Sequence, residues 1–116
     1  MKTFPIFFIT FALTATFALA GNGSINPGQT TRNIGKDVQV AGKVDSVVAM
    51  YKGTYLKFSH KPHGFTVVIP SSTRGQFDNP YKYTGQQVAV TGRVEKNEFG
   101  DPQITVTSPK QISVVK

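Results

Sequence analysis

The sequence predicts a small all-β domain that follows an N-terminal targeting segment. In several stretches apolar and polar residues alternate, and this period of two is typical of strands with one buried face. The stretches are short, and residues that favour turns separate them. The chain has 116 residues, which is enough for one domain.

The first 20 residues have the three parts of a secretory signal peptide. Lys2 supplies the positive charge, an apolar run extends from Phe4 to Leu19, and small residues at 18 and 20 fit a cleavage site. The run is shorter than the ~20 apolar residues of a membrane-spanning helix, so a retained anchor is the less favoured alternative. We therefore expect a periplasmic or secreted protein with no membrane span after cleavage. Cysteine is absent from the sequence, which excludes lipid attachment and disulfide bonds.

Cleavage after residue 20 would leave 96 residues with a clear positive charge. The precursor carries 13 Lys and Arg residues and 6 Asp and Glu residues. Lys2 is the only charged residue in the signal, so 12 and 6 remain, and the net charge is +6. A basic domain favours polyanions such as nucleic acid or acidic glycans. The cations form no run, so the charge is equally consistent with a role in solubility.

The elements can be predicted in order from the first mature residue. Residues 21–35 are polar and rich in Gly, Asn and Thr, so we expect a flexible leader. The folded domain is expected at 36–116. Its first strand is predicted by the alternation from Val38 to Val44, and the same period continues as far as Met50.

Two further strands are predicted at residues 55–59 and 65–69. In the first of them Leu56 and Phe58 are expected to face the core, which leaves the residues between them outside. Residues 60–64 are expected to form a loop, because Pro and Gly interrupt a strand ladder.

The period disappears after Pro70, and residues 71–84 are compatible with a short helix or an irregular connection. Phe77 and Tyr81 lie four positions apart, as on one face of a helix, although Pro80 argues against a long helix. The remaining pattern predicts a fourth strand at 86–94, a hairpin turn at 97–102, a fifth strand at 103–107 and a short end at 112–115.

Two of the predicted strands repeat one pattern, fifty positions apart. Residues 35–44 and 85–94 both match G-x-x-V-x-V-x-G-[K/R]-V. A glycine inside a strand relieves crowding where a strongly coiled strand bends around a small barrel. Chance likeness between two β-strands is the weaker explanation, because the two copies also share the Gly-Lys/Arg-Val ending.

With this pattern in strands one and four, the region from Gly35 to Val115 resembles the OB (oligonucleotide/oligosaccharide-binding) fold of small bacterial nucleic-acid-binding domains. Residues 102–112 are also similar to the end of such domains. The resemblance implies a five-stranded Greek-key barrel with a helix or irregular segment between strands three and four. A small β-sandwich or SH3-like barrel is the structural alternative. Exported OB proteins of envelope stress are a weaker match, because the acidic turn expected between their strands two and three is absent.

The OB resemblance implies a ligand face on strands two and three, flanked by the loop after strand one and by the last hairpin. Aromatic and basic side chains interleaved there suit single-stranded nucleic acid, because rings stack on bases and cations follow phosphates. For each residue an ordinary exposed position on a β-surface is the alternative. The candidate binding residues are Tyr51, Lys52, Tyr55, Lys57, Thr66, Arg93, Lys96 and Phe99.

The sequence offers little support for a metal site or for catalysis. His60 and His63 lie across a turn, but a closed zinc site needs four ligands and no cysteine is present, so an exposed basic loop is favoured. No acid/base carboxylate pair, nucleophile elbow or Gly-rich phosphate loop is recognisable. We therefore expect no enzyme activity, cofactor or metal. The favoured function is an exported OB-fold module that binds single-stranded nucleic acid or another polyanion. The alternative is a periplasmic envelope protein whose barrel binds a protein or glycan partner.

Overall fold

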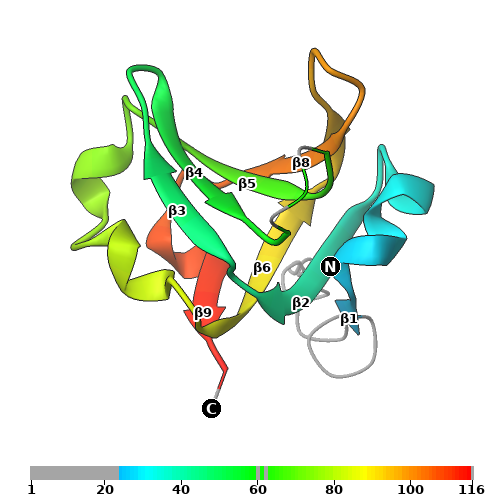
Figure 1. Ribbon diagram of the computed structural model, residues 1–116, viewed down its shortest axis with the longest axis horizontal. Helices are drawn as coiled ribbons and strands as arrows, with labels where there is room; N and C mark the ends of the chain where they lie inside the picture. Colours follow the sequence, from blue (N-terminus) through cyan, green and yellow to red (C-terminus); the bar gives the residue numbers. More distant parts are fainter. Residues whose placement is uncertain (1–23, 60, 62, 116) are drawn as a thin grey trace, which may run out of the picture.

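The computed structural model describes residues 24–59, 61 and 63–115, and the expected signal peptide lies outside them. This part of the chain consists of short strands joined by turns and 3-10 helices (Figure 1), which confirms the all-β prediction. No helix within it is long and apolar enough to cross a membrane. The strands are β1 (Ser24–Ile25), β2 (Asp37–Lys43), β3 (Ser46–Ala49), β4 (Gly53–Lys57), β5 (Thr66–Pro70), β6 (Gln87–Arg93), β7 (Glu95–Lys96), β8 (Pro102–Thr105) and β9 (Ile112–Val114). The 3-10 helices are η2 (Pro27–Asn33), η3 (Arg74–Gln76), η4 (Pro80–Tyr83) and η5 (Pro109–Gln111).

The strands form two sheets, and the chain passes directly from one sheet to the other at two places. One sheet has the order β1-β2-β6-β9 and the other the order β3-β4-β5-β8-β7. β2 continues into β3 and β6 continues into β7, so each of these pairs is one bent strand that serves both sheets. If each bent pair counts as one strand, the five main strands in chain order are β2–β3, β4, β5, β6–β7 and β8. Numbered 1 to 5, they lie side by side in the order 1-2-3-5-4-1, which is that of the partly open Greek-key OB barrel. The OB-type fold is thus confirmed, although the hydrogen bonds form two sheets rather than one closed ring.

The first bend lies at Val44 and Asp45, between β2 and β3. The N–H of Val44 donates to the carbonyl of Gln86 (2.9 Å), and the N–H of Asp45 donates to the carbonyl of Lys57 (2.7 Å). Two successive amides therefore bond to different sheets, which makes this the corner of the barrel. The alternation that continues to Met50 in the sequence consequently belongs to two strands.

The repeated pattern forms the antiparallel pair β2 and β6, and each central glycine lies opposite a valine of the other copy. A Cβ at Gly42 would lie 2.6 Å from Cγ of Pro27, and a Cβ at Gly92 would lie 2.6 Å from Cγ2 of Ile104. Real Cβ atoms are not found so close to another heavy atom. The glycines therefore allow packed side chains to approach the strands closely.

Both copies of the pattern also begin with a similar turn. The N–H of Gly35 donates to the carbonyl of Val94 (2.7 Å), and the N–H of Gly85 donates to the carbonyl of Val44 (2.8 Å). Both glycines have positive φ angles, 91° and 76°, which favour glycine over other residues. The sequence repeat thus reflects a local two-fold relationship between the two bent strands.

Ordered structure begins earlier than the sequence suggests. β1 pairs in parallel with β2, and a capping box closes the start of η2. Thr30 is fully buried, and its hydroxyl donates to the carbonyl of Pro27 (2.7 Å). Residues 24–33, a part of the expected leader, thus contain β1 and the capped helix η2. Their order depends on capping and on a proline packed against a glycine, neither of which gives an apolar pattern.

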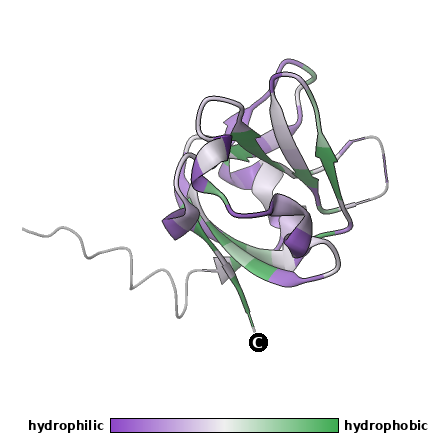
Figure 2. Cartoon of the chain, turned by 90° about the vertical axis from the view of Figure 1, so that its left-hand side faces the viewer, coloured by the Kyte–Doolittle hydropathy of each residue, from purple (hydrophilic) through white to green (hydrophobic). Residues whose placement is uncertain are grey.

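The hydrophobic core lies between the two sheets. Hydrophobic stretches lie on the strands, whereas the turns and short helices are mostly hydrophilic (Figure 2). Leu56 is fully buried as predicted, whereas Phe58 is half-buried and packs with its ring centroid 5.1 Å from that of Phe65. The largest fully buried side chains are Leu56, Ile69 and Ile104.

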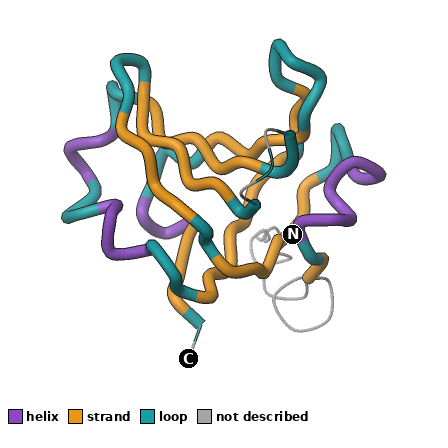
Figure 3. Tube along the Cα trace, viewed as in Figure 1, coloured by secondary structure: helices purple, strands orange, loops and turns teal. Residues whose placement is uncertain are grey.

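The connection between β5 and β6 contains η3 and η4, which lie on the flank opposite η2 (Figure 3). Phe77 and Tyr81 do not share a buried face, because Tyr81 is exposed, whereas Phe77 and Tyr83 are buried in the core. Two short 3-10 helices replace one α-helix here, and Pro80 begins the second of them. Burial raises the pKa of the Tyr83 phenol above its ordinary value of 10.0.

Candidate functional site

The sheet that contains β4, β5 and β8 has a groove on its outer face, with a volume of about 370 Å³. The β3–β4 hairpin and the β7–β8 hairpin rise at opposite ends of this sheet and flank it (Figure 1). We call this feature the outer groove. It lies on the strands and between the loops where the OB resemblance implied a ligand face.

Strand register brings the floor of the outer groove together. Lys57 of β4 lies opposite Thr66 of β5, which in turn lies opposite Gln103 of β8. Tyr55 precedes Lys57 by two residues and therefore projects from the same face. All four side chains are half-buried and line the groove, whereas the intervening Leu56 is fully buried. The period-two pattern thus separates the core face from the groove face correctly.

The β3–β4 hairpin contributes Met50 and Lys52 to one side of the outer groove. Its turn is closed by the N–H of Met50, which donates to the carbonyl of Gly53 (2.8 Å). The guanidinium of Arg74, from η3, donates through Nη2 to the carbonyl of Met50 (2.9 Å). This hairpin is therefore attached to the connection beside it rather than standing alone.

The β7–β8 hairpin forms the other side of the outer groove, and Asn97 shapes its turn. Its side-chain Oδ1 accepts hydrogen bonds from the N–H of Phe99 (2.8 Å) and from the N–H of Asp101 (3.0 Å). Gly100 has a positive φ of 85° at the same turn. The Phe99 side chain is 73% exposed and lines the groove, so an apolar ring is presented to solvent there.

A contact between two distant segments fixes the last hairpin. Nδ1 of His63 lies 2.8 Å from Oδ2 of Asp101, and the two residues are 38 positions apart. An ionised carboxylate only accepts hydrogen bonds, so Nδ1 donates. His60, the other half of the His-x-x-His sequence, lies outside the described residues. Within residues 24–59, 61 and 63–115, no group of three His, Asp or Glu side chains is placed to hold a metal ion.

Most of the sequence-predicted binding residues meet in one place. The structure brings five of the eight together along the outer groove. These five are Lys52, Tyr55, Lys57, Thr66 and Phe99.

The other three predicted residues do not line the outer groove. Tyr51 is 95% exposed at the tip of the β3–β4 hairpin. Arg93 ends β6 on the other sheet, where its Nη2 lies 3.4 Å from Oδ2 of Asp37. Lys96 is exposed on β7 and lies opposite Pro102, so it does not share the face of Gln103, which lines the groove.

Sequence reasoning missed several residues that line the outer groove. Gln103 is the first outward residue of β8, and alternation alone gave a signal for it. Glu98 and Asp101 lie in the predicted turn, but a turn prediction does not show which side chains face a groove. In the sequence Met50 appeared to be the end of the first predicted strand. It lies in the β3–β4 hairpin instead, because the corner at Val44 and Asp45 divides that strand into β2 and β3.

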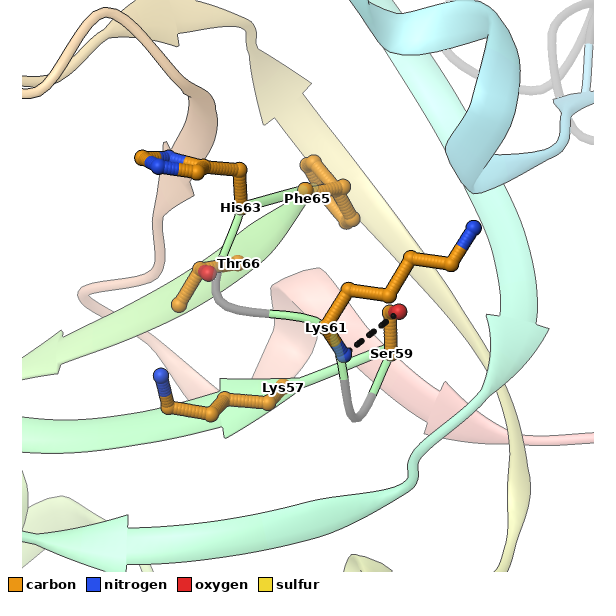
Figure 4. A pocket seen from close by; sticks show the side chains of 7 residues that line it. Lys57, Ser59, Lys61, His63, Phe65 and Thr66 are labelled. Atoms are coloured by element: carbon orange, nitrogen blue, oxygen red, sulfur yellow. Dashed lines mark hydrogen bonds between the residues drawn. The ribbon is translucent and has the colours of Figure 1, made fainter.

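A small depression next to the outer groove gathers several basic side chains. It is lined by Lys57, Ser59, Lys61 and His63, among others, and its volume is only about 10 Å³. The N–H of Lys61 donates to Oγ of Ser59 (3.1 Å). Figure 4 shows that the side chain of Lys61 points away from those of Lys57 and His63. They therefore do not converge on a single anion site.

Comparison with known proteins establishes the fold and nothing finer. No family model matches the sequence, and no curated protein does. The chain is similar to the structure of asparaginyl-tRNA synthetase from Pyrococcus horikoshii, with 17% identity and a TM-score of 0.56, over 79% of this chain and 23% of that one. It is also similar to aspartyl-tRNA synthetase from Entamoeba histolytica, with 16% identity and a TM-score of 0.56, over 94% of this chain and 24% of that one. The chain therefore spans less than a quarter of these two proteins.

Proposed function

We propose that the protein is an exported OB-fold module whose outer groove binds single-stranded nucleic acid. The observation that carries this proposal is the meeting of two aromatic rings with two cations along one groove. Tyr55 lies on its floor and Phe99 on one side, while Lys52 and Lys57 lie along the other side and the floor. Tyr55 belongs to β4 and Phe99 to the β7–β8 hairpin, so the fold brings these two rings to one groove from segments that are distant in the sequence.

The chemistry of these side chains suits a flexible polyanion. Each base that stacks on an aromatic ring contributes about 1–3 kcal/mol, with little dependence on sequence. Lysine side chains replace the counterions of phosphates, so the affinity falls as the salt concentration rises. A groove open at the protein surface accommodates unpaired bases, whereas a duplex hides them in its stack.

The structural neighbours give independent support. Both are aminoacyl-tRNA synthetases, enzymes whose names refer to an RNA substrate. This likeness supports a nucleic-acid-binding module more than a catalytic one, because the match covers only a part of each enzyme. Export is supported by the signal-peptide pattern in the first 20 residues and forms a separate part of the proposal.

The proposal can be tested by fluorescence-anisotropy titration of the purified protein with labelled single-stranded DNA and RNA, at low and at moderate salt. We expect saturable binding that weakens with salt. Tyr55→Ala should weaken binding at both salt concentrations, whereas Lys57→Ala should also reduce the slope of log affinity against log salt by about one. Lys110→Ala is the matched control, because Lys110 is exposed in η5 and does not line the groove. Absence of saturable binding, or an affinity that does not depend on the salt concentration, would contradict the proposal.

One observation favours the alternative partner. Glu98 and Asp101 line the same groove as Lys52 and Lys57, so the charges of these four side chains cancel. A balanced, polar groove also suits a glycan or a protein of the cell envelope. The same kind of titration with a labelled glycan tests this alternative. Saturable binding that does not depend on salt, and that is lost in Tyr55→Ala and Phe99→Ala, would support it.

A further inference from the structure

The charges of the outer groove are separated by sign. Lys52 belongs to the β3–β4 hairpin and Lys57 to β4, whereas Glu98 and Asp101 belong to the β7–β8 hairpin. In the sheet order β3-β4-β5-β8-β7, β5 lies between these two groups. One side of the groove is therefore basic and the other is acidic.

The acidic side has one carboxylate held in place before any ligand binds. The Asp101 side chain is only 20% exposed, and its Oδ2 accepts from Nδ1 of His63 at 2.8 Å. Its backbone is also fixed on both sides, because its N–H donates to Oδ1 of Asn97 (3.0 Å) and its carbonyl accepts from the N–H of Asn97 (2.8 Å). Among the described residues, none donates a hydrogen bond to the second oxygen, Oδ1. A carboxylate oriented in this way can discriminate between ligands, because little ordering is needed on binding.

We infer that Asp101 selects bases that carry an amino group on their Watson–Crick edge, and so favours cytosine over uracil. This inference rests on the proposed nucleic-acid function of the groove. The phosphates follow the lysines of the basic side, and the base then projects toward the β7–β8 hairpin. There the ring of Phe99 stacks on it, and the carboxylate of Asp101 accepts a hydrogen bond from its amino group.

Cytosine and uracil differ at the position that this carboxylate reads. Cytosine has the N4 amino donor, and carboxylates of Asp and Glu accept from it. Uracil has a carbonyl oxygen at the same position, and two acceptors facing each other leave both without a partner. The mismatch also places partial negative charge against a carboxylate. Discrimination of about tenfold in dissociation constant is therefore expected.

The test compares labelled oligodeoxycytidylate and oligodeoxyuridylate of equal length, titrated into the purified protein at neutral pH. The wild type should bind the cytidine strand about tenfold more tightly. Asp101→Asn replaces one acceptor with an amide donor, so the preference should disappear or reverse, while the affinity for the uridine strand is kept or rises. A purely structural role for Asp101 would instead weaken both strands alike. Asp78→Asn is the control for the loss of one negative charge, because Asp78 is exposed outside the groove. This variant should retain the cytidine preference.

The possible failures are distinguishable. Equal binding of both strands by the wild type, or a preference that Asp101→Asn leaves intact, would overturn the role of Asp101 and leave the groove proposal standing. If neither strand binds, the proposed nucleic-acid function itself is wrong, and the selectivity of Asp101 is wrong with it.

Discussion

The side chain of Gln111, in η5, connects the segment that follows β8 to β6. Its Oε1 accepts from the N–H of Thr107 (2.9 Å) and from the N–H of Ser108 (3.2 Å). Its Nε2 donates to the carbonyl of Thr91 in β6 (3.1 Å). One half-buried amide thus provides hydrogen-bond partners for backbone groups of the segment after β8 and of β6.

Removal of this amide should destabilise the protein measurably. Gln111→Ala is expected to lower the free energy of unfolding by about 1–3 kcal/mol, because it leaves partly buried backbone groups without partners. Urea denaturation followed by circular dichroism measures the change. Gln76→Ala is the control, since Gln76 is exposed in η3 and its loss should change stability by less than about 0.5 kcal/mol. Equal stability of the two variants would show that the Gln111 network contributes nothing.

Single residues also show the limit of what the sequence predicts about the site. Tyr55, Lys57 and Thr66 could be placed on one face because strand alternation fixes the direction of each side chain. The pair of His63 and Asp101 could not be predicted, because it depends on how two loops 38 residues apart approach each other. Local patterns identify the floor of the groove, whereas its sides require the three-dimensional arrangement of the hairpins.

At the scale of elements, periodicity identified the main strands but not the corner between β2 and β3. The alternation of buried residues ends at Val44, and in β3 only Val47 packs against the core, whereas Val48 is 37% exposed. The change of sheet is visible only in the hydrogen bonds, where Val44 and Asp45 bond to different partners. The ordered segment that contains η2 was also missed, because Pro27 packs against a glycine and Thr30 is a buried polar residue.

The two strand glycines give an element-scale prediction. Gly42→Ala forces a methyl group onto Pro27 of η2, and Gly92→Ala forces one onto Ile104 of β8. Each should cost about 1–3 kcal/mol, because a packed core relaxes only at the expense of shifted neighbours. Chemical denaturation measures both, with Gly75→Ala as the control, since a Cβ there meets no atom within 4 Å.

Alanine at the two strand positions should thus behave differently from alanine in open space. If Gly42→Ala and Gly92→Ala lower the free energy of unfolding no more than Gly75→Ala does, the packing explanation is wrong. In that case the repeated glycines would reflect only the bending of the strands.

For the whole molecule, the two bent strands explain how one small core supports an open binding surface. They carry the chain around the corners, so one sheet buries its inner face while its outer face holds the groove between two hairpins. The absence of cysteine means that no disulfide contributes, and stability depends on packing and hydrogen bonds. In the proposed function, the overall positive charge of the chain attracts the nucleic acid at long range, and the rings of the groove stack on its bases.

The most direct test of the central claim is an NMR titration of the 15N-labelled protein with a single-stranded oligonucleotide of about ten residues. Binding in the outer groove predicts that the shifted amides belong to residues 50–57, 64–66 and 97–103. Amides of β2, β6 and β9, on the other sheet, should remain in place. Shifts concentrated on that sheet, or no saturable shifts, would contradict the assignment of the outer groove as the site of nucleic-acid binding.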